Sequence, residues 1–196
     1  KGDAGEVIHA FANGQAEDVL VAEAPANKGY GNSMTIAFDV EDDITAKMFL
    51  LSLSETVCTR LRKDNVLVSV ISVGIQYFDF TYESHQITLF TPTNTTSEIY
   101  HHACMIFDRL WSGVPIRHLG IHTSRVSEDD ETRQLNLFDM NRYEQLRKLD
   151  RAVDKIRKRY GEDSIMRATF LNGEIYHMCG GICPEKRKAN YEGVKM

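Results

Sequence analysis

Residues 66–80 read VLVSVISVGIQYFDF and carry the strongest strand signal in the chain. Apolar side chains recur at every second position, which is the period of a strand with one buried face. The residues expected to face a core share odd numbers: Leu67, Ile71, Val73, Ile75 and Tyr77. Ser72, Gly74 and Gln76 have the other parity and are small or polar, so we expect them on an open face of the sheet.

The segment before this strand predicts another strand and a helix. Residues 33–38 alternate polar and apolar side chains, as a half-buried strand does. Asp42 and Asp43 then supply the negative charge that favours a helix N-terminus. We therefore expect a helix over residues 42–63. Its apolar residues recur near a helical period: Ile44, Met48, Leu51, Cys58 and Leu61.

The segment after it predicts a returning strand, a helix and a last strand. Residues 79–84 have the composition of a hairpin turn, and residues 85–90 that of a strand. Residues 95–98, Thr-Thr-Ser-Glu, form a capping box, which begins a helix over 96–111. Residues 116–125 predict the last strand. The side chains expected to face the core are Ile99, Ala103, Ile106, Leu110, Leu119 and Ile121.

This order of elements is β-α-β-β-α-β, which predicts an α+β domain over residues 31–126. The arrangement is the split βαβ, or ferredoxin-like, fold: a four-stranded antiparallel sheet with two helices on one face. The uncovered face of such a sheet is the natural binding surface of the domain. The fold by itself fixes no function, because it carries many.

Further segments flank this domain. Residues 1–14 end a helical element, and residues 15–30 read as a linker. Residues 127–140 form an acidic linker, and residues 141–196 hold a helix and a tail. The helix is expected over 141–160. Its apolar stripe comprises Tyr143, Leu146, Leu149, Val153, Ile156 and Tyr160.

The other side chains of this last helix are mostly basic. They are Arg147, Lys148, Arg151, Lys155, Arg157, Lys158 and Arg159. Two interpretations stay open for them: a solvated face, or a contact with a DNA backbone or a partner protein. Beyond the helix, residues 165–171 have the pattern of a short strand, and no fold is evident from Asn172 onwards.

Charge divides the chain into two unequal parts, although its net charge is only −5. Residues 1–140 hold ten Lys and Arg against twenty Asp and Glu, whereas residues 141–196 hold thirteen against eight. An acidic body argues against a broad electrostatic footprint for nucleic acid on that body. No apolar run approaches a bilayer span, so we expect a cytoplasmic protein with no membrane partner. Since the first residue is Lys1, we expect a fragment of a longer protein.

The sequence gives little support for a metal site or a catalytic nucleophile in this chain. Cys58 and Cys104 lie on helical patterns and are expected to be small core residues, with all four cysteines reduced. His177, Cys179 and Cys183 are three potential zinc ligands, but their spacing fits a zinc ribbon poorly and no fourth ligand is evident. No strand carries the carboxylate cluster that Mg²⁺-dependent catalysis needs. We expect no catalytic residue, metal or cofactor in this chain.

The acidic linker contains the pentapeptide Gln134-Leu135-Asn136-Leu137-Phe138. Leu135, Leu137 and Phe138 are costly to leave in water, and the usual reason to keep such a segment is a partner's groove. The alternative is a linker that folds back on its own domain. Short motifs also match by chance, so the spacing alone leaves both open.

Two resemblances add to these observations. The pentapeptide resembles the sliding-clamp-binding motif of bacterial DNA polymerases, which reads Gln, Leu, any residue, Leu, Phe. Residues 28–125 resemble the little-finger domain of Y-family translesion polymerases of the DNA polymerase IV and UmuC type (ImpB/MucB/SamB family). The phrase at residues 11–14 resembles the end of their thumb domain, which implies that residues 1–14 are a thumb stub. The segment after the pentapeptide resembles UmuC-like polymerases more than DNA polymerase IV.

The resemblance implies a surface for damaged double-stranded template-primer DNA. The residues it implicates on the sheet are Ser33, Thr35, Ser72, Gln76 and His85. Where relatives often carry Arg-x-Arg, this chain has His85-Gln86-Ile87, which implies a weak grip. A solvated sheet face is the alternative for all five residues.

The resemblance also implies that the clamp is bound by Gln134, Leu135, Leu137 and Phe138. The whole protein would then be an error-prone DNA-directed DNA polymerase of the DNA damage (SOS) response, with its Mg²⁺ in a palm domain outside this chain. The chain alone would be inactive. The competing interpretation is a ferredoxin-like protein-interaction module with no nucleic-acid role.

Overall fold

The structure, a computed structural model, describes residues 3–15, 27–129, 140–171 and 173–180. Its strands are β1 (Gly29–Val40), β2 (Val66–Tyr77), β3 (Tyr82–Thr93) and β4 (Ile116–Glu128). Its helices are α1 (Asp3–Ala12), α2 (Asp43–Lys63), α3 (Thr96–Leu110) and α4 (Met140–Tyr160), followed by the 3-10 turns η1 (Glu162–Ser164) and η2 (Ala168–Phe170). Among these helices none is long and apolar enough to cross a membrane.

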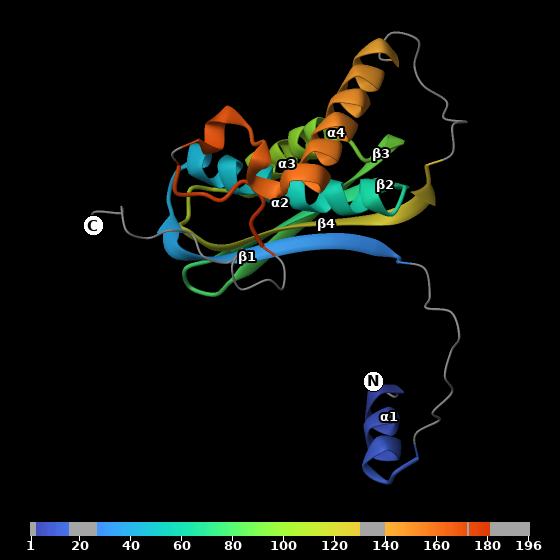
Figure 1. Cartoon of the computed structure of the whole chain (residues 1–196). Coiled ribbons are helices and arrows are strands. Elements are labelled where there is room, and N and C mark those ends of the chain that lie inside the picture. Colours follow the sequence, from blue (N-terminus) through green and yellow to red (C-terminus); the bar gives the residue numbers. More distant parts are fainter. Residues whose placement is uncertain (1–2, 16–26, 130–139, 172, 181–196) are drawn as a thin grey trace.

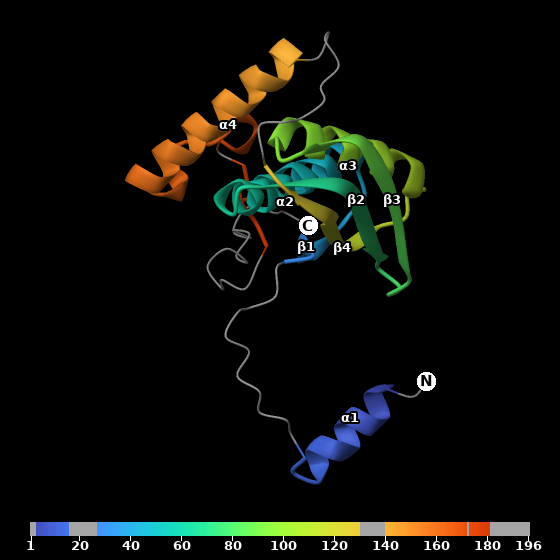
Figure 2. The ribbon, with the colours of Figure 1, turned by 90° about the vertical axis from the view of Figure 1, so that its right-hand side faces the viewer.

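The four strands form one antiparallel sheet in the order β1-β4-β2-β3, and α2 and α3 lie on one of its faces (Figure 1). Figure 2 shows the same two layers from the side. Each helix joins two strands that have one other strand between them, as the split βαβ arrangement requires. The predicted fold class and element order are confirmed.

The predicted alternation of buried and open-face side chains is confirmed in the second half of β2 and is wrong in its first half. Ile71, Val73, Ile75 and Tyr77 lie in the core. Leu67 is buried outside the core cluster, and Val68 takes the predicted place. The alternation reverses because the chain is irregular between Val68 and Val70, opposite Arg125 of β4, whose φ is +54°.

The hairpin is tighter than predicted. β2 ends at Tyr77 instead of residue 80, and β3 begins at Tyr82 instead of residue 85. Asp79 accepts hydrogen bonds from the backbone N–H and the hydroxyl of Thr81, at 3.0 and 2.6 Å. Phe80 adopts a φ of +68°. This local turn reverses the chain within four residues and leaves Phe78 and Phe80 exposed.

Helix α2 is enclosed on more sides than an amphipathic surface helix. Asp42 caps its first turn by accepting from the N–H of Thr45 at 2.7 Å, as its charge predicted. The buried residues include polar ones: Ser52, Ser54, Glu55 and Thr56. Ile44, which was expected inside, is exposed. A simple apolar stripe therefore describes α2 poorly, because the C-terminal segments cover a second side of it.

Helix α3 begins as predicted, but a residue from another element completes its cap. Glu98 accepts hydrogen bonds from the hydroxyls of Thr93 and Thr95, so the capping box does not close on the backbone in the usual way. The N–H of Thr96 donates instead to Asp150 of α4, at 2.9 Å. A carboxylate at a helix N-terminus is favoured by the helix dipole. This contact links the end of the chain to the sheet-covering layer.

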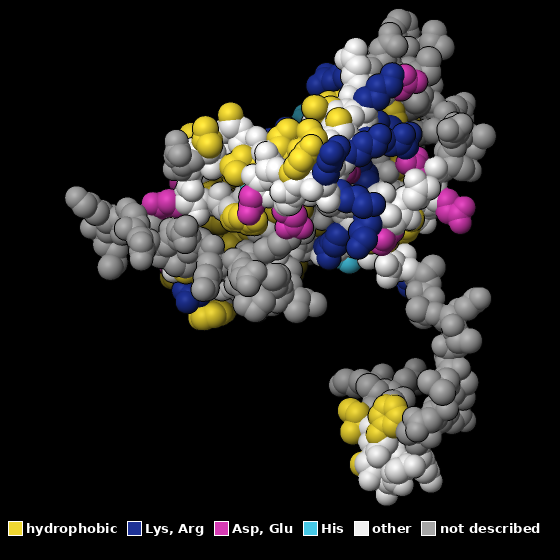
Figure 3. Space-filling model, in the orientation of Figure 1, with side chains coloured by type: hydrophobic (Ala, Val, Ile, Leu, Met, Phe, Trp, Pro, Cys, Tyr) yellow, Lys and Arg dark blue, Asp and Glu magenta, His cyan; other side chains and the backbone are white. Residues whose placement is uncertain are grey.

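Helix α4 turns a polar line toward the domain, contrary to the predicted apolar stripe. Tyr143, Asp150 and Arg157 are buried at seven-residue intervals, whereas Leu149 and Tyr160 are exposed. Two carboxylates, those of Asp150 and Asp154, pair with the buried Arg62 of α2. Figure 3 shows Lys and Arg side chains gathered in a band over α4. Buried ion pairs rather than apolar packing determine which face of α4 points inward.

The segment after α4 is folded over residues 161–171 and 173–180, and these residues contain no strand. η2 lies where residues 165–171 predicted one, and η1 comes just before that stretch. Residues 173–180 then pack against α2 and β1, with Ile175, Met178 and Cys179 buried. The N–H of Cys179 donates to Ser52 Oγ, and the side-chain amide of Asn32 donates to the carbonyl of Cys179, both at 2.7 Å. This segment thus closes over α2 and reaches β1, the edge strand.

Glu55 lies at the centre of this C-terminal packing. Its carboxylate accepts from Arg157 Nη1 at 2.8 Å and from Arg167 Nε at 2.6 Å. Arg157 and Glu55 are 6% and 4% exposed. A buried charge of this kind is tolerated only with an opposite charge and hydrogen bonds in place.

We predict that Glu55→Gln destabilises the protein strongly. The substitution keeps the shape of the side chain but leaves Arg157 buried without a counter-charge. Removing one partner of a buried ion pair costs about 3–5 kcal/mol, so the free energy of unfolding at pH 7 should fall by about that amount. Urea unfolding followed by circular dichroism measures the change.

The acid sensitivity of the two proteins should differ as well. Burial raises the pKa of Glu55, but hydrogen bonds from Arg157 and Arg167 outweigh this and hold the pKa below its ordinary value of 4.5. Such a carboxyl stabilises the fold above pH 4.5 and loses this effect as the pH falls through its folded-state pKa. The wild type should therefore lose more stability than Glu55→Gln below that pH. Glu144→Gln, at an exposed site on α4, removes the same charge and should behave as wild type; three equal stabilities would contradict a role for the buried pair.

Candidate nucleic-acid interface

The open face of the sheet is a grid of three rows across four strands. Directly opposed residues of antiparallel strands point to the same face, so the register assigns the side chains. The first row is Gly31, His122, Ser72 and Gln86; the second is Ser33, Gly120, Gly74 and Ser84; the third is Thr35, His118, Gln76 and Tyr82. Each row takes one residue from β1, β4, β2 and β3 in turn.

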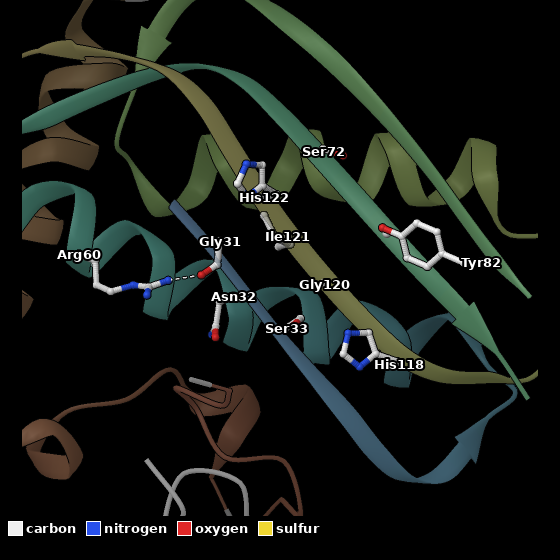
Figure 4. A pocket seen from close by; sticks show the side chains of 11 residues that line it. Gly31, Asn32, Ser33, Arg60, Ser72, Tyr82, His118, Gly120, Ile121 and His122 are labelled. Carbon is white, nitrogen blue, oxygen red and sulfur yellow. Dashed lines mark hydrogen bonds between the residues drawn. The ribbon is translucent and has the colours of Figure 1, made fainter. Parts of the chain in front are cut away.

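The middle row contains only glycine and serine, which makes the face hollow. The hollow has a volume of about 540 Å³, and Figure 4 shows the side chains around it. A Cβ added at Gly120 would lie 2.9 Å from Cβ of Ser33, and one at Gly74 would collide with the hydroxyl of Tyr82. Glycine at these two positions therefore lets neighbouring side chains lie flat across the sheet.

Polar and aromatic groups form the rim of this hollow. Nδ1 of His118 lies 3.0 Å from the hydroxyl of Thr35, and Tyr82 extends from β3 with most of its ring exposed. Burial lowers the pKa of His118, so its imidazole is neutral at pH 7. At the β1 edge, the guanidinium of Arg60 donates to the carbonyl of Gly31 (Figure 4). The hollow thus offers hydroxyl, amide and imidazole groups with one cation at its edge.

Four of the five residues implicated from the sequence share this face. Ser33 and Ser72 line the hollow, while Thr35 and Gln76 lie in the third row. His85 does not join them. It is opposite Val73, an inward-facing residue, so its side chain belongs to the helix-covered face. The placement of His85 on the open face was wrong, because the parity of β3 depends on its register with β2.

Sequence reasoning missed the residues that give the face its character. His118, Gly120 and His122 alternate along β4, and this two-residue period was a signal that one face of β4 carries imidazoles around a glycine. Tyr82 was assigned to the turn. Arg60 comes from α2 and approaches the sheet only through the fold.

The open face offers neutral hydrogen-bonding side chains and lacks cations at its grid positions. None of its twelve grid positions is Lys or Arg. Hydroxyl and amide side chains hydrogen-bond phosphate oxygens and carry no sequence information when they do so. Without cations such a surface releases few counterions, and this limits its affinity.

Two further expectations lie wholly or partly outside the described residues. The peptide residues Gln134, Leu135, Leu137 and Phe138 lie outside them, as does Cys183. Within the described part of the chain, no group of three or more His, Cys, Asp and Glu is placed to hold a metal. His177 instead lies 3.0 Å from Asp163 and 3.4 Å from Arg157.

Several known proteins with similar sequences are named DNA polymerase IV. DNA polymerase IV 2 of Bacillus subtilis (strain 168) is 36% identical over 172 residues, which make up 85% of this chain and 41% of that protein. DNA polymerase IV of Clostridium kluyveri is 34% identical over 179 residues, 87% of this chain and 44% of that protein. The chain therefore spans less than half the length of these relatives.

A solved complex of the beta-clamp processivity factor and the little finger domain of PolIV contains a chain with a TM-score of 0.42 and 20% identity to this one. The alignment covers 56% of this chain and 97% of that chain. The family model of the impB/mucB/samB C-terminal domain matches residues 27–137, more than half of the sequence. The chain therefore belongs to the impB/mucB/samB family of Y-family DNA polymerases and carries that family's C-terminal domain.

Proposed function

We propose that this chain is the non-catalytic C-terminal part of an error-prone translesion DNA polymerase. It grips damaged template-primer duplex with the open face of its sheet and docks on the sliding clamp through residues 134–138. The whole protein acts in the cytoplasm during the DNA damage (SOS) response. The observation that carries this proposal is the family's C-terminal domain at residues 27–137.

The face suits a ligand whose bases are altered. Ser33, Thr35, Ser72 and Gln76 offer neutral hydrogen-bonding groups to a phosphate backbone, and such contacts carry no sequence information. Recognition of the backbone alone tolerates a damaged base. The hollow between the rows provides space for a sugar-phosphate strand to approach the sheet.

Catalysis belongs to another part of the whole protein. Nucleotidyl transfer needs Mg²⁺ held by carboxylates, and we assign both to a palm domain in the more than half of the relatives' length that this chain does not span. The 196-residue chain alone should therefore not polymerise DNA.

The clamp peptide makes a weak grip sufficient. A polymerase held on a clamp that encircles DNA meets its substrate at high effective concentration, so each DNA contact needs little affinity of its own. A sheet face without Lys or Arg then serves as a guide along the duplex rather than as the source of binding strength.

The same lack of cations favours the competing function, a protein-interaction module with no nucleic-acid role. Interfaces between proteins tolerate neutral, hollow surfaces with aromatic rims, and Tyr82 supplies such an aromatic residue. The two functions differ in whether the isolated chain binds duplex DNA at low salt.

We predict weak, salt-sensitive and sequence-independent duplex binding by this chain. His122→Glu places a negative charge on the open face beside the hollow, so it should weaken binding at low salt by roughly tenfold through repulsion of phosphate. Fluorescence anisotropy with a labelled duplex at two salt concentrations measures the affinity.

His85→Glu is the matched control, because it makes the same change on the opposite face of the sheet. It should leave the affinity near that of the wild type. Equal losses in the two variants would contradict the open face as the DNA surface. Absence of binding at low salt, or a strong sequence preference, would favour the interaction module.

We predict that residues 134–138 bind the bacterial sliding clamp. Leu137 and Phe138 would fill an apolar pocket, and burying two such side chains is worth roughly 3–5 kcal/mol before ordering costs. Ordering the peptide gives part of this back, so the dissociation constant should be micromolar. A Leu137→Ala, Phe138→Ala double variant should bind at least tenfold more weakly in isothermal titration calorimetry.

Asn136→Ala provides the control, since position 136 tolerates any residue in the resembled motif. It should bind like the wild type. If the double variant and the control bind equally well, or if the unaltered chain shows no clamp binding, the peptide is a linker.

A further inference from the structure

The fold divides the charges of α4 into a neutralised set and a free set. Inside, Arg147 pairs with Asp129 and Arg157 with Glu55, while Asp150 and Asp154 pair with Arg62. The two aspartates of α4, Asp150 and Asp154, are therefore already paired with Arg62 and do not neutralise the basic residues of their own helix. The sequence shows that α4 has an excess of basic residues, but only the structure shows which of them lack a close buried counter-charge.

The free set on one flank of the helix has five exposed members: Lys148, Arg151, Lys155, Lys158 and Arg159. Arg142 is exposed as well, but it lies near the helix N-terminus on the other flank. The side chains of Lys148 and Arg151 are 80% and 60% exposed, and their nearest carboxylates, Glu144 and Asp129, are 3.9 Å away. Contacts as long as these, made by cations that remain mostly exposed, neutralise little charge. Positions three, four and seven apart align along a helix, so these side chains form one continuous basic surface.

This surface continues from α4 onto the last turn of α2. A hollow of about 210 Å³ lies between the two helices, with Arg151 and Lys155 on one side and Asn65, just after α2, on the other. Lys63 is exposed in that last turn, and Arg60, one turn earlier, lines the hollow of the open sheet face. In Figure 3 the band of Lys and Arg side chains runs from α4 down the domain without a wide gap.

The composition of this flank favours a phosphate backbone over a protein. A protein partner needs aromatic or apolar anchors at the centre of its interface. The exposed large hydrophobic residues of α4 lie on its other flank, away from Lys148 and Lys155: Leu149, Ile156 and Tyr160. Nucleic-acid backbones require only an array of cations, and their binding follows the number of phosphates neutralised.

We propose that the free cations of α4, together with the last turn of α2, form a second nucleic-acid surface that binds the phosphate backbone. It supplies the positive charge that the open sheet face lacks. The inference rests on the proposed function in one respect, namely that both surfaces serve the same DNA. Its own evidence is the charge separation on α4, which is independent of the sheet.

The test compares two triple variants of the full chain. Lys148→Gln, Lys155→Gln and Lys158→Gln remove three cations from the surface. Lys47→Gln, Arg109→Gln and Arg117→Gln remove three cations far from this surface. Lys47 of α2 pairs with Asp108 of α3, and Arg117, at the start of β4, pairs with Asp39. Both triples change the net charge equally. Equal thermal unfolding midpoints of the three proteins would exclude a folding defect.

Duplex binding is measured by anisotropy across a series of salt concentrations. Each phosphate contact contributes about 0.9 to the slope of log affinity against log salt, so the α4 triple should lower the slope by about two to three and weaken low-salt binding at least tenfold. The control triple should keep the wild-type slope. If both triple variants lose affinity and salt slope equally, the loss follows from the change in net charge alone, and the proposal is overturned.

Two comparisons distinguish this inference from the proposed function. Loss of binding in the α4 triple with none in His122→Glu would overturn the sheet face as a DNA surface and support α4; the reverse would overturn α4. Polyglutamate of the same total charge serves as a competitor. If it displaces the chain from duplex as effectively as unlabelled DNA does, the surface binds acidic protein and the proposal fails.

Discussion

The buried carboxylate of Glu55 controls how the C-terminal third of this chain meets the domain. It lies on α2 between Arg157 of α4 and Arg167 of the following turn, and it has almost no access to water. An isolated ion in such a place is expensive, so Glu55 and its two arginines are stable only together. A second ion-pair cluster lies in the last turn of α2, where Arg62 pairs with Asp150 and Asp154 of α4. Because α4 must present both sets to α2, its rotation about its own axis is fixed.

That rotation determines what the outside of the protein offers. With Asp150 and Arg157 inward, one flank of α4 is left basic and the other apolar. The sheet below has the opposite character, since its open face is neutral and hollow around Gly74 and Gly120. If both proposed surfaces bind the same DNA, different surfaces would provide the binding strength and the close approach. In that case the cations of the basic flank would contribute most of the affinity, because each phosphate that they neutralise releases counterions.

Sequence patterns predicted the part of the fold that depends on local periods. The alternation in β2 and the stripe of α3 placed Ile71, Val73 and Ile99 correctly, because each needs only its own strand or helix to be recognised. The rule that apolar residues face inward failed for α4, where ion pairs with residues about 90 to 100 positions away outweigh it. His85 failed for a similar reason. The face of His85 is set by the pairing of β3 with β2, in which His85 lies opposite Val73, and no pattern within β3 itself shows that pairing.

The chain order also limits how far apart the proposed surfaces can act. β4, a central strand of the sheet, ends at Glu128, and α4 begins at Met140, so the proposed clamp peptide lies between the two proposed DNA surfaces in the sequence. The ten residues 130–139 reach at most about 35 Å when fully extended. A clamp bound to residues 134–138 would therefore hold both the neutral face and the basic flank within a few nanometres of the DNA that it encircles. Under that constraint, weak contacts on two sides of one small domain suffice, because neither has to capture DNA from solution.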